Sequence, residues 1–508
     1  MTATATHPEP AGTARGAARG GLANMAGSAL AGGAGVAVTW IVARVLGPEE
    51  AGALFAATAA FVLAGGLAKL GTHTGLVYWP ARLRATGRDH LLGACLRAGL
   101  PPVVVFSVLL AAAMWVAAPW IAGLTAGQTP HVIAEHTAGL RVLAVFVPLQ
   151  ALTDVLLTVT RGYRSMRPTV LLDRILRSAL QLLAVGAAGV AAMGAAGVAA
   201  MGAAASLPVF AFAWAVPYLP VVILAGFAAR TAYRKGLVRA EITRTERRRL
   251  RRDFWIFTAP RAVAAVAQLA LQRVDVLLVA ALGGLAPAAV YAVAGRFVVL
   301  IQFANQGLSQ SVQPRLAEAL STGDRAAAKR LYQIATGWLV LVTWPICLLV
   351  IAFAPRYLRL FGEGYAAGVP VVLVLAATML VATGCGMVDM VLAMAGRTSA
   401  NLANVLIALA VTVCLDVLLI PRWGAIGAAA GLAGAMLVNN LLPLAQVYRG
   451  TRLHPFGAGT LGAAALAIGC FGFVVLVPAA VVAAVPAYAA GAWLLRGPLM
   501  LGAFRRKS

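Results

Sequence analysis

The feature that most constrains this chain is a succession of long apolar runs, separated by short connectors that carry most of its charge. A helix needs about 20 apolar residues to cross the ~30 Å hydrocarbon core of a bilayer. Only 11% of the residues are charged, whereas a soluble domain typically has roughly 25%. The runs therefore predict an all-α, polytopic membrane protein with about fourteen transmembrane helices and no large soluble domain.

Connectors rich in Lys and Arg alternate with connectors nearly free of them. Cytoplasmic loops of membrane proteins carry an excess of basic residues, and a missed or added helix would invert the alternation downstream. The alternation predicts that both termini and the basic run from Arg230 to Asp253 are cytoplasmic. Topology thus accounts for the formal net charge of +25, and no nucleic-acid partner is expected. Attraction of the basic run to anionic membrane lipids is an alternative explanation of its charge.

The same basic run divides the predicted helices into two sets. A pattern that begins at Leu46 and Gly47 recurs at a fixed offset, at Leu282 and Gly283. Parallel repeats of this kind build two lobes around a substrate path in several transporter families. We expect two pseudo-repeated six-helix lobes plus two C-terminal helices. The predicted units are a disordered cytoplasmic tail at 1–20, an N-terminal lobe at 21–230, a basic cytoplasmic linker at 231–253, a C-terminal lobe at 254–448, and two last helices with a cytoplasmic tail at 449–508.

Sequence motifs give no support to catalysis. The chain has no nucleotide-binding loop, no HExxH pattern and no Ser/His/Asp constellation, and its five cysteines stand singly within apolar runs. No enzyme activity, cofactor or metal site is therefore predicted. The informative residues are instead ionisable groups inside the spans, each costing ~2.5 to 3.5 kcal/mol near a helix centre on insertion scales. Such groups face protein or a water-filled cavity, so they mark a candidate substrate path.

These residues are of three kinds, and most of the charged ones fall in the cytoplasmic half of their helices. They describe a polar cavity that is open to the cytoplasm. For any single residue, mutual neutralisation of Asp and Arg between helices is an equally good interpretation. The cations are Lys69, Arg174, Arg177, Arg261 and Arg273; the carboxylates, for ion coupling or charge balance, are Asp154, Asp173, Asp275 and Asp389; the neutral polar candidates are Gln268, Gln272, Gln302 and Gln306.

Four stretches, in this order and spacing, carry a resemblance to a known family: VARVLGPEEAGALF at 42–55, RVDVLLVAALGGLAPAAVYAVAGRF at 273–297, FGEGY at 361–365 and IPRWGAIGAAAG at 420–431. From about residue 22 to 495 the chain resembles polysaccharide-biosynthesis flippases of the O-antigen type. These belong to the multidrug/oligosaccharidyl-lipid/polysaccharide exporter superfamily. The resemblance implies a cell-membrane protein whose two lobes alternate access. It also implies a cargo made in the cytoplasm, an undecaprenyl-diphosphate-linked sugar or oligosaccharide.

A diphosphate headgroup needs cationic partners in a desolvated cavity, which is the role that the resemblance implies for the five cations. The alternative is a multidrug exporter of the same superfamily, which would exchange a coupling ion, H⁺ or Na⁺, for an organic cation through the cavity carboxylates. The cations and the two extra C-terminal helices favour the lipid-linked glycan. A membrane-embedded glycan polymerase would need a large external loop, and the external connectors are too short for one.

Overall fold

The computed structural model describes residues 11–125, 129–163, 165–195, 206–235, 242–495 and 497, with side chains from residue 27 onward except at 195, 235 and 310. Within these ranges the chain forms helices and turns, and no strand is present. The all-α prediction is confirmed. Residues 1–10 of the predicted tail lie outside the described ranges, and the first helix begins at Ala11, earlier than predicted.

In the described residues, eleven helices are long and apolar enough to cross a membrane, or twelve if one bent pair counts as a single span. The first of the eleven, Gly27–Ala85, has 59 residues. At ~1.5 Å per residue it would be roughly 90 Å long, about three times the hydrocarbon thickness. This stretch is divided by a kink at Gly47 and a break before Thr72. A multi-pass membrane protein is thereby confirmed, while the count of about fourteen helices stays a prediction.

The helices before residue 236 form one group, which we call the N-lobe. Buried apolar side chains of α1 and α4 pack at its centre, and the other helices surround them. Its elements are α1 (Ala11–Ala68), α2 (Thr72–Ala85), η1 (Asp89–Leu91), α3 (Leu92–Thr125), α4 (Pro130–Gly162), η2 (Thr169–Arg177), α5 (Ser178–Ala195), α6 (Leu207–Ala215) and α7 (Tyr218–Lys235).

The helices from residue 285 onward form a second group, the C-lobe, in which α17 to α19 pack against α11 on the outside. Its elements are α9 (Leu285–Ala294), α10 (Arg296–Ser321), α11 (Arg325–Ala352), α12 (Ala354–Arg359), η4 (Glu363–Gly368), α13 (Val369–Gly384), α14 (Val388–Met394), α15 (Thr398–Trp423), α16 (Ala425–Thr451), α17 (Ala458–Ala467), η5 (Ile468–Gly472), α18 (Phe473–Leu476), η6 (Pro478–Ala480) and α19 (Val481–Leu494).

Both lobes break a helix near the start of the sequence repeat, but one residue out of register. Gly47 has φ 75° and precedes Pro48 at the kink of α1, and Gly284 has φ 96° between α8 and α9. Positive φ is a conformation that glycine adopts without steric cost, and proline cannot donate the next helical hydrogen bond. Gly283, which the repeat aligns with Gly47, has φ −110°, so the two breaks lie one residue apart in the repeat, and the repeat itself stays a prediction.

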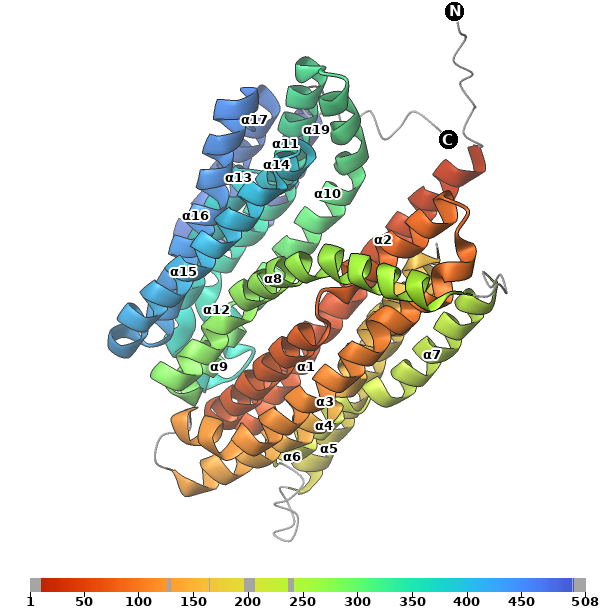
Figure 1. The fold of residues 1–508 in the computed structure, drawn as a ribbon. Helices are drawn as coiled ribbons and strands as arrows, with labels where there is room; N and C mark the ends of the chain where they lie inside the picture. Colours follow the sequence, from red (N-terminus) through yellow and green to blue (C-terminus); the bar gives the residue numbers. More distant parts are fainter. Residues whose placement is uncertain are drawn as a thin grey trace, which may run out of the picture.

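Helix α8 (Arg244–Leu282) joins the lobes, and Figure 1 shows it arching from one group of helices to the other. Leu250 and Phe254 are buried in a cluster with the N-lobe side chains, whereas the last turns of α8 pack against α15. The helix starts at a capping box, in which Thr243 and Glu246 bond to each other's backbone N–H groups at 3.2 and 3.0 Å. Most of the predicted basic linker is thus helical, and residues 236–241 of it lie outside the described ranges.

The lobes are joined by hydrogen bonds at one end of the molecule, and α1 also packs against α10 farther along, where an added Cβ on Gly32 would lie 1.8 Å from the Phe303 ring. The indole Nε1 of Trp40 and the Nε of Arg44 both donate to the carbonyl oxygen of Leu360, at 2.8 and 2.9 Å. The hydroxyl of Tyr365 donates to the Ala43 carbonyl at 3.4 Å. In Figure 1 the helix groups converge near α9 and α12 and lie farther apart near the end of α2 and the start of α11. On the predicted topology, the end that is held together is the external one.

Candidate functional site

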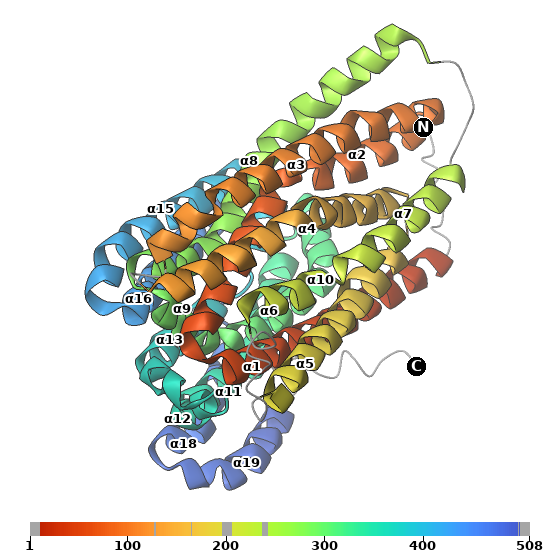
Figure 2. The ribbon, with the colours of Figure 1, turned by 90° about the horizontal axis from the view of Figure 1, so that it is seen from below.

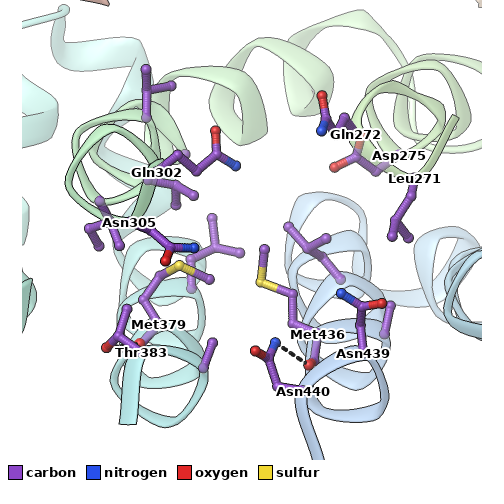
Figure 3. A pocket seen from close by; sticks show the side chains of 18 of the residues that line it. Leu271, Gln272, Asp275, Gln302, Asn305, Met379, Thr383, Met436, Asn439 and Asn440 are labelled. Carbon is purple, nitrogen blue, oxygen red and sulfur yellow. Dashed lines mark hydrogen bonds between the residues drawn. The ribbon is translucent and has the colours of Figure 1, made fainter. Parts of the chain in front are cut away.

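A cavity of about 390 Å³ lies within the C-lobe and is bounded by α8, α10, α13 and α16 (Figure 3). In this view the amides of Gln272, Gln302 and Asn305 point toward the central space from two sides. An amide offers both donors and acceptors, so such a wall can bond to ligand hydroxyl groups in either sense. The amide side chains that line the cavity are Gln268, Gln272, Gln302, Asn305, Asn439 and Asn440.

Four charged residues also line this cavity: Arg273, Arg296, Asp275 and Asp389. The described residues contain two ion pairs with N···O distances within 4.0 Å, and neither includes any of these four. Asp275 instead accepts hydrogen bonds from the Tyr291 hydroxyl and from the Val276 N–H, the latter at 2.8 Å. The Nε atoms of both arginines and one oxygen of Asp389 are buried without a hydrogen-bond partner. Arg273, Arg296 and Asp389 therefore keep hydrogen-bonding capacity that no group in the described residues uses.

The N-lobe holds a different arrangement, in which cations and carboxylates pair directly. The Nζ of Lys69 lies 2.8 Å from an oxygen of Asp154 on α4. Lys69 is not inside a helix, because α1 ends at Ala68 and the backbone turns through Leu70, with φ 49°, and Gly71, with φ 72°. This break lets the ammonium group reach α4.

The second N-lobe pair lies on η2, a π-helical segment at the start of the fifth predicted span. Arg177 Nε is 2.8 Å from Asp173, and its guanidinium lies 5.3 Å from the ring centroid of Tyr218. A weaker contact of 3.4 Å joins Arg177 to Gln181. The i,i+4 spacing predicted this cluster on one helix face. Arg174, its neighbour, donates to the Ser28 hydroxyl of α1.

We expect the Lys69–Asp154 pair to be structural, so replacing Asp154 with Asn should destabilise the protein. The side chains are 25% and 31% exposed, so we expect a loss of about 1 to 3 kcal/mol, below the ~3 to 5 kcal/mol of a fully buried broken pair. A double variant, Lys69→Met with Asp154→Asn, should recover most of the lost stability. Thermal unfolding of the purified variants measures both. A stable Asp154→Asn protein that no longer transports would instead give the pair a functional role.

The structure thus divides the predicted site residues between two places and leaves some outside both. The C-lobe cavity contains Gln268, Gln272, Arg273, Asp275, Gln302 and Asp389. Direct N-lobe ion pairs contain Lys69, Asp154, Asp173 and Arg177. Arg174, Arg261 and Gln306 do not line the cavity. Arg261 is exposed, donates to the Phe257 carbonyl at 2.8 Å and lies 3.7 Å from the centroid of the Phe257 ring.

Sequence reasoning missed several polar residues of the C-lobe. Arg296, Asn439 and Asn440 line the cavity, and they stand between apolar stretches. Asp416 on α15 is the most isolated: it is 0% exposed, and both of its carboxylate oxygens are buried without a hydrogen-bond partner. It faces α16 at Gly431, where an added Cβ would lie 2.0 Å from Asp416 Oδ1. A lone carboxylate in the apolar run 398–423 was the signal that could have revealed it.

Comparison with solved structures identifies the class of fold. The chain is similar to the lipid II flippase MurJ in an inward closed conformation, with a TM-score of 0.69 and 12% identity over 94% of this chain and 99% of that chain. An inward-facing multidrug resistance MATE transporter matches with a TM-score of 0.60 and 16% identity, over 82% and 94%. A transporter from Pyrococcus furiosus matches with a TM-score of 0.54 and 16% identity, over 86% and 96%. The last two are described as members of the MOP superfamily, the superfamily named in the sequence analysis, and this chain has the MOP transporter fold.

The family model matches a smaller part of the chain than the solved structures do. The model of the MatE family matches residues 260–421, which extend from the bend of α8 to the end of α15 and include much of the cavity wall. A search among curated proteins gave no match. All three structures are described as flippases or transporters. The family match over this part of the chain and the shared fold agree with the superfamily predicted from the sequence.

Proposed function

We propose that this protein translocates a lipid-diphosphate-linked sugar or oligosaccharide from the cytoplasmic to the outer leaflet by alternating access, in cell-envelope polysaccharide biosynthesis. The observation that carries the proposal is the C-lobe cavity, where Arg273 and Arg296 are free of ion pairs and amides line the wall. The structural similarity to a lipid II flippase over 94% of the chain supports it.

The chemistry of the cavity suits such a headgroup. A guanidinium binds two phosphate oxygens at once through its planar fork, and these charge-assisted bonds are about twice as strong as neutral ones. The amides can donate to and accept from sugar hydroxyls. A volume of about 390 Å³ falls in the range of roughly 300 to 1,000 Å³ that is usual for small-molecule sites, so the cavity can hold part of a headgroup.

The arrangement of the lobes fits the loading step. Their contacts through Trp40, Arg44 and Tyr365 close one end, and the predicted topology assigns this end to the outside. A headgroup from the cytoplasmic leaflet would then enter from the opposite end. Rupture of the contacts at Leu360 and Ala43 would release it outward.

Reconstituted vesicles test the proposed function. A fluorescent oligosaccharide on a polyprenyl diphosphate is placed in both leaflets, and the outer pool is destroyed by an impermeant reagent. Protein-dependent loss of the inner pool supports flipping. Uptake of a fluorescent organic cation by the same vesicles, without glycolipid movement, would establish the exporter instead.

The alternative of a cation-coupled multidrug exporter draws on the carboxylates. Asp275 and Asp416 are 5% and 0% exposed, and neither is in an ion pair in the described residues. A bare charge is costly in such surroundings, so a buried carboxylate of this kind can hold a coupling proton or small cation. Either function can use such a group for coupling to H⁺ or Na⁺.

We therefore expect Asp416→Asn to remove the dependence of transport on an H⁺ or Na⁺ gradient. The amount of folded protein should not fall, because the change removes an isolated buried carboxylate. Transport by proteoliposomes with and without each gradient measures this. Glu363→Gln, at an exposed residue of η4, is the control. Unchanged gradient dependence in Asp416→Asn would exclude Asp416 from coupling.

A further inference from the structure

The first turns of α8 carry an unusual concentration of unpaired positive charge. Arg248, Arg249, Arg251 and Arg252 are all exposed, and in the described part of the chain none makes an ion pair, side-chain hydrogen bond or ring contact. Two acids are nearby: Glu246 is held by Thr243, and Asp253, which borders the same surface, is in neither ion pair of the described residues. The four guanidinium groups therefore face solvent or lipid without a protein partner.

Two arginines of α2, at the same end of the molecule, are anchored. The guanidinium of Arg84 donates to the Gly162 carbonyl and lies 4.6 Å from the centroid of the Tyr163 ring. Arg82 lies 5.2 Å from the Trp79 ring. Positive-inside topology requires basic residues near this end but does not require them to lie free on one helix face. Topology therefore does not by itself account for four exposed arginines within five residues of one helix.

These arginines border an open hollow on the surface, which within the described residues is lined by α8 alone. At helical spacing, Ile256 and Ala259 follow Arg248 and Arg252 on the same side of α8. This face is therefore basic in the first turns of the helix and apolar in the turns that follow. Ile256 is 63% exposed. Trp255 borders the same hollow, and its indole N–H donates to the Ala98 carbonyl at 3.2 Å, which holds this part of α8 against α3. We call the surface formed by Arg248, Arg249, Arg252, Ile256 and Ala259 the α8 basic face.

A partner for this face must be anionic at one end and apolar immediately below. A phospholipid with a net negative headgroup meets both requirements, because arginine binds phosphate in a bidentate manner and the exposed Ile256 can contact an acyl chain. A soluble anion would leave Ile256 and Ala259 without a role. Figure 2 shows the first turns of α8 running beside α2 and α3 to the outer edge of the molecule, where lipids would have access.

We propose that the α8 basic face binds the headgroups of anionic phospholipids in the cytoplasmic leaflet. Leu250 and Phe254, on the other side of the same turns, are buried in the N-lobe cluster. Bound lipid would therefore hold the N-lobe end of the connecting helix at the membrane surface. This inference does not depend on which substrate is translocated.

The test uses full-length protein in a neutral detergent, titrated with phosphatidylglycerol or phosphatidylcholine, with bound lipids counted by native mass spectrometry. We expect preferential binding of phosphatidylglycerol that weakens as salt is raised. Arg248→Gln with Arg252→Gln should weaken that binding roughly 30-fold, which is ~1 kcal/mol for each arginine. Arg325→Gln with Arg330→Gln removes the same charge from α11 and should change it less than threefold.

Three results would overturn the proposal. One is equal binding of the two lipids by the unchanged protein, a measurement that does not depend on any variant folding. Another is equal weakening by the two double variants, which would reflect net charge alone. The third is displacement of phosphatidylglycerol by micromolar inorganic diphosphate, which would identify a site for soluble anions.

Discussion

Replacing Arg273 or Arg296 with Gln is expected to slow translocation of a lipid-diphosphate-linked sugar by roughly 10- to 150-fold for each residue. The estimate follows from the ~1.5 to 3 kcal/mol that a hydrogen bond to a charged group contributes. The amount of folded protein should stay the same, because neither arginine is in an ion pair in the described residues, so its removal leaves no carboxylate without a direct partner. Translocation in vesicles and membrane abundance are measured together.

Two further variants sharpen this test. Arg273→Lys keeps the charge but loses the bidentate fork, so its rate should fall between those of the unchanged protein and the Gln variant. Arg356→Gln is the matched control: Arg356 lies 5.3 Å from the Phe353 ring, much as Arg296 lies 5.7 Å from Phe55, but it is exposed and outside the cavity. If Arg273→Gln and Arg356→Gln translocate equally well, the cavity arginines do not bind the substrate.

Replacing Gly52 with Ala is expected to disrupt closure of the lobes at their contact end. A Cβ at this position would lie 1.9 Å from the Leu285 carbonyl oxygen and 2.6 Å from its carbonyl carbon. Backbone atoms of a packed helix cannot move aside as a flexible side chain can, so α1 and α9 must separate. The packing within each lobe is not affected. We expect a folded protein whose external contact is open and whose transport cycle is slowed at least tenfold, if closure costs more than ~1.4 kcal/mol extra.

Spin labels at Glu49 of α1 and Glu363 of η4, both exposed, report this opening as a longer distance between the lobes. Gly226→Ala on α7 serves as the control, because a Cβ there meets no atom within 4 Å. It should be neutral or slightly stabilising, as Ala is the better helix former by ~1 kcal/mol. An unchanged distance in the Gly52→Ala protein would contradict the close approach of α1 and α9.

Local sequence patterns were sufficient for the class of fold and for part of the site. Long apolar runs predict membrane helices because lipid leaves the backbone no other hydrogen-bond partner. The i,i+4 spacing of Asp173 and Arg177 predicted their contact, since helical neighbours are decided by sequence separation alone. The capping box of Thr243 and Glu246 can also be recognised in the sequence. It would have placed the start of α8 within the predicted linker.

Helix α8 shows where such reasoning stops. Arg261 and Gln268 are seven residues apart, a spacing that places them on one face of α8, yet Gln268 lines the cavity and Arg261 does not. The first half of α8 packs with the N-lobe around Phe254, and only the second half reaches the C-lobe. Two residues on one helix face have side chains that point in the same direction from the helix axis. Whether these side chains line the same cavity also depends on which other helices pack against each turn.

The sequence by itself determined that this is a multi-pass helical membrane protein with charges buried in its spans, because hydropathy and periodicity belong to single segments. Only the tertiary structure decided which charged side chains form ion pairs and which do not. Lys69 meets Asp154 across 85 positions of sequence, whereas Arg273 and Asp416 have no ion-pair partner in the described residues. The physical reason is that an ion pair requires atoms within about 4 Å, a condition set by the packing and rotation of helices from distant parts of the chain.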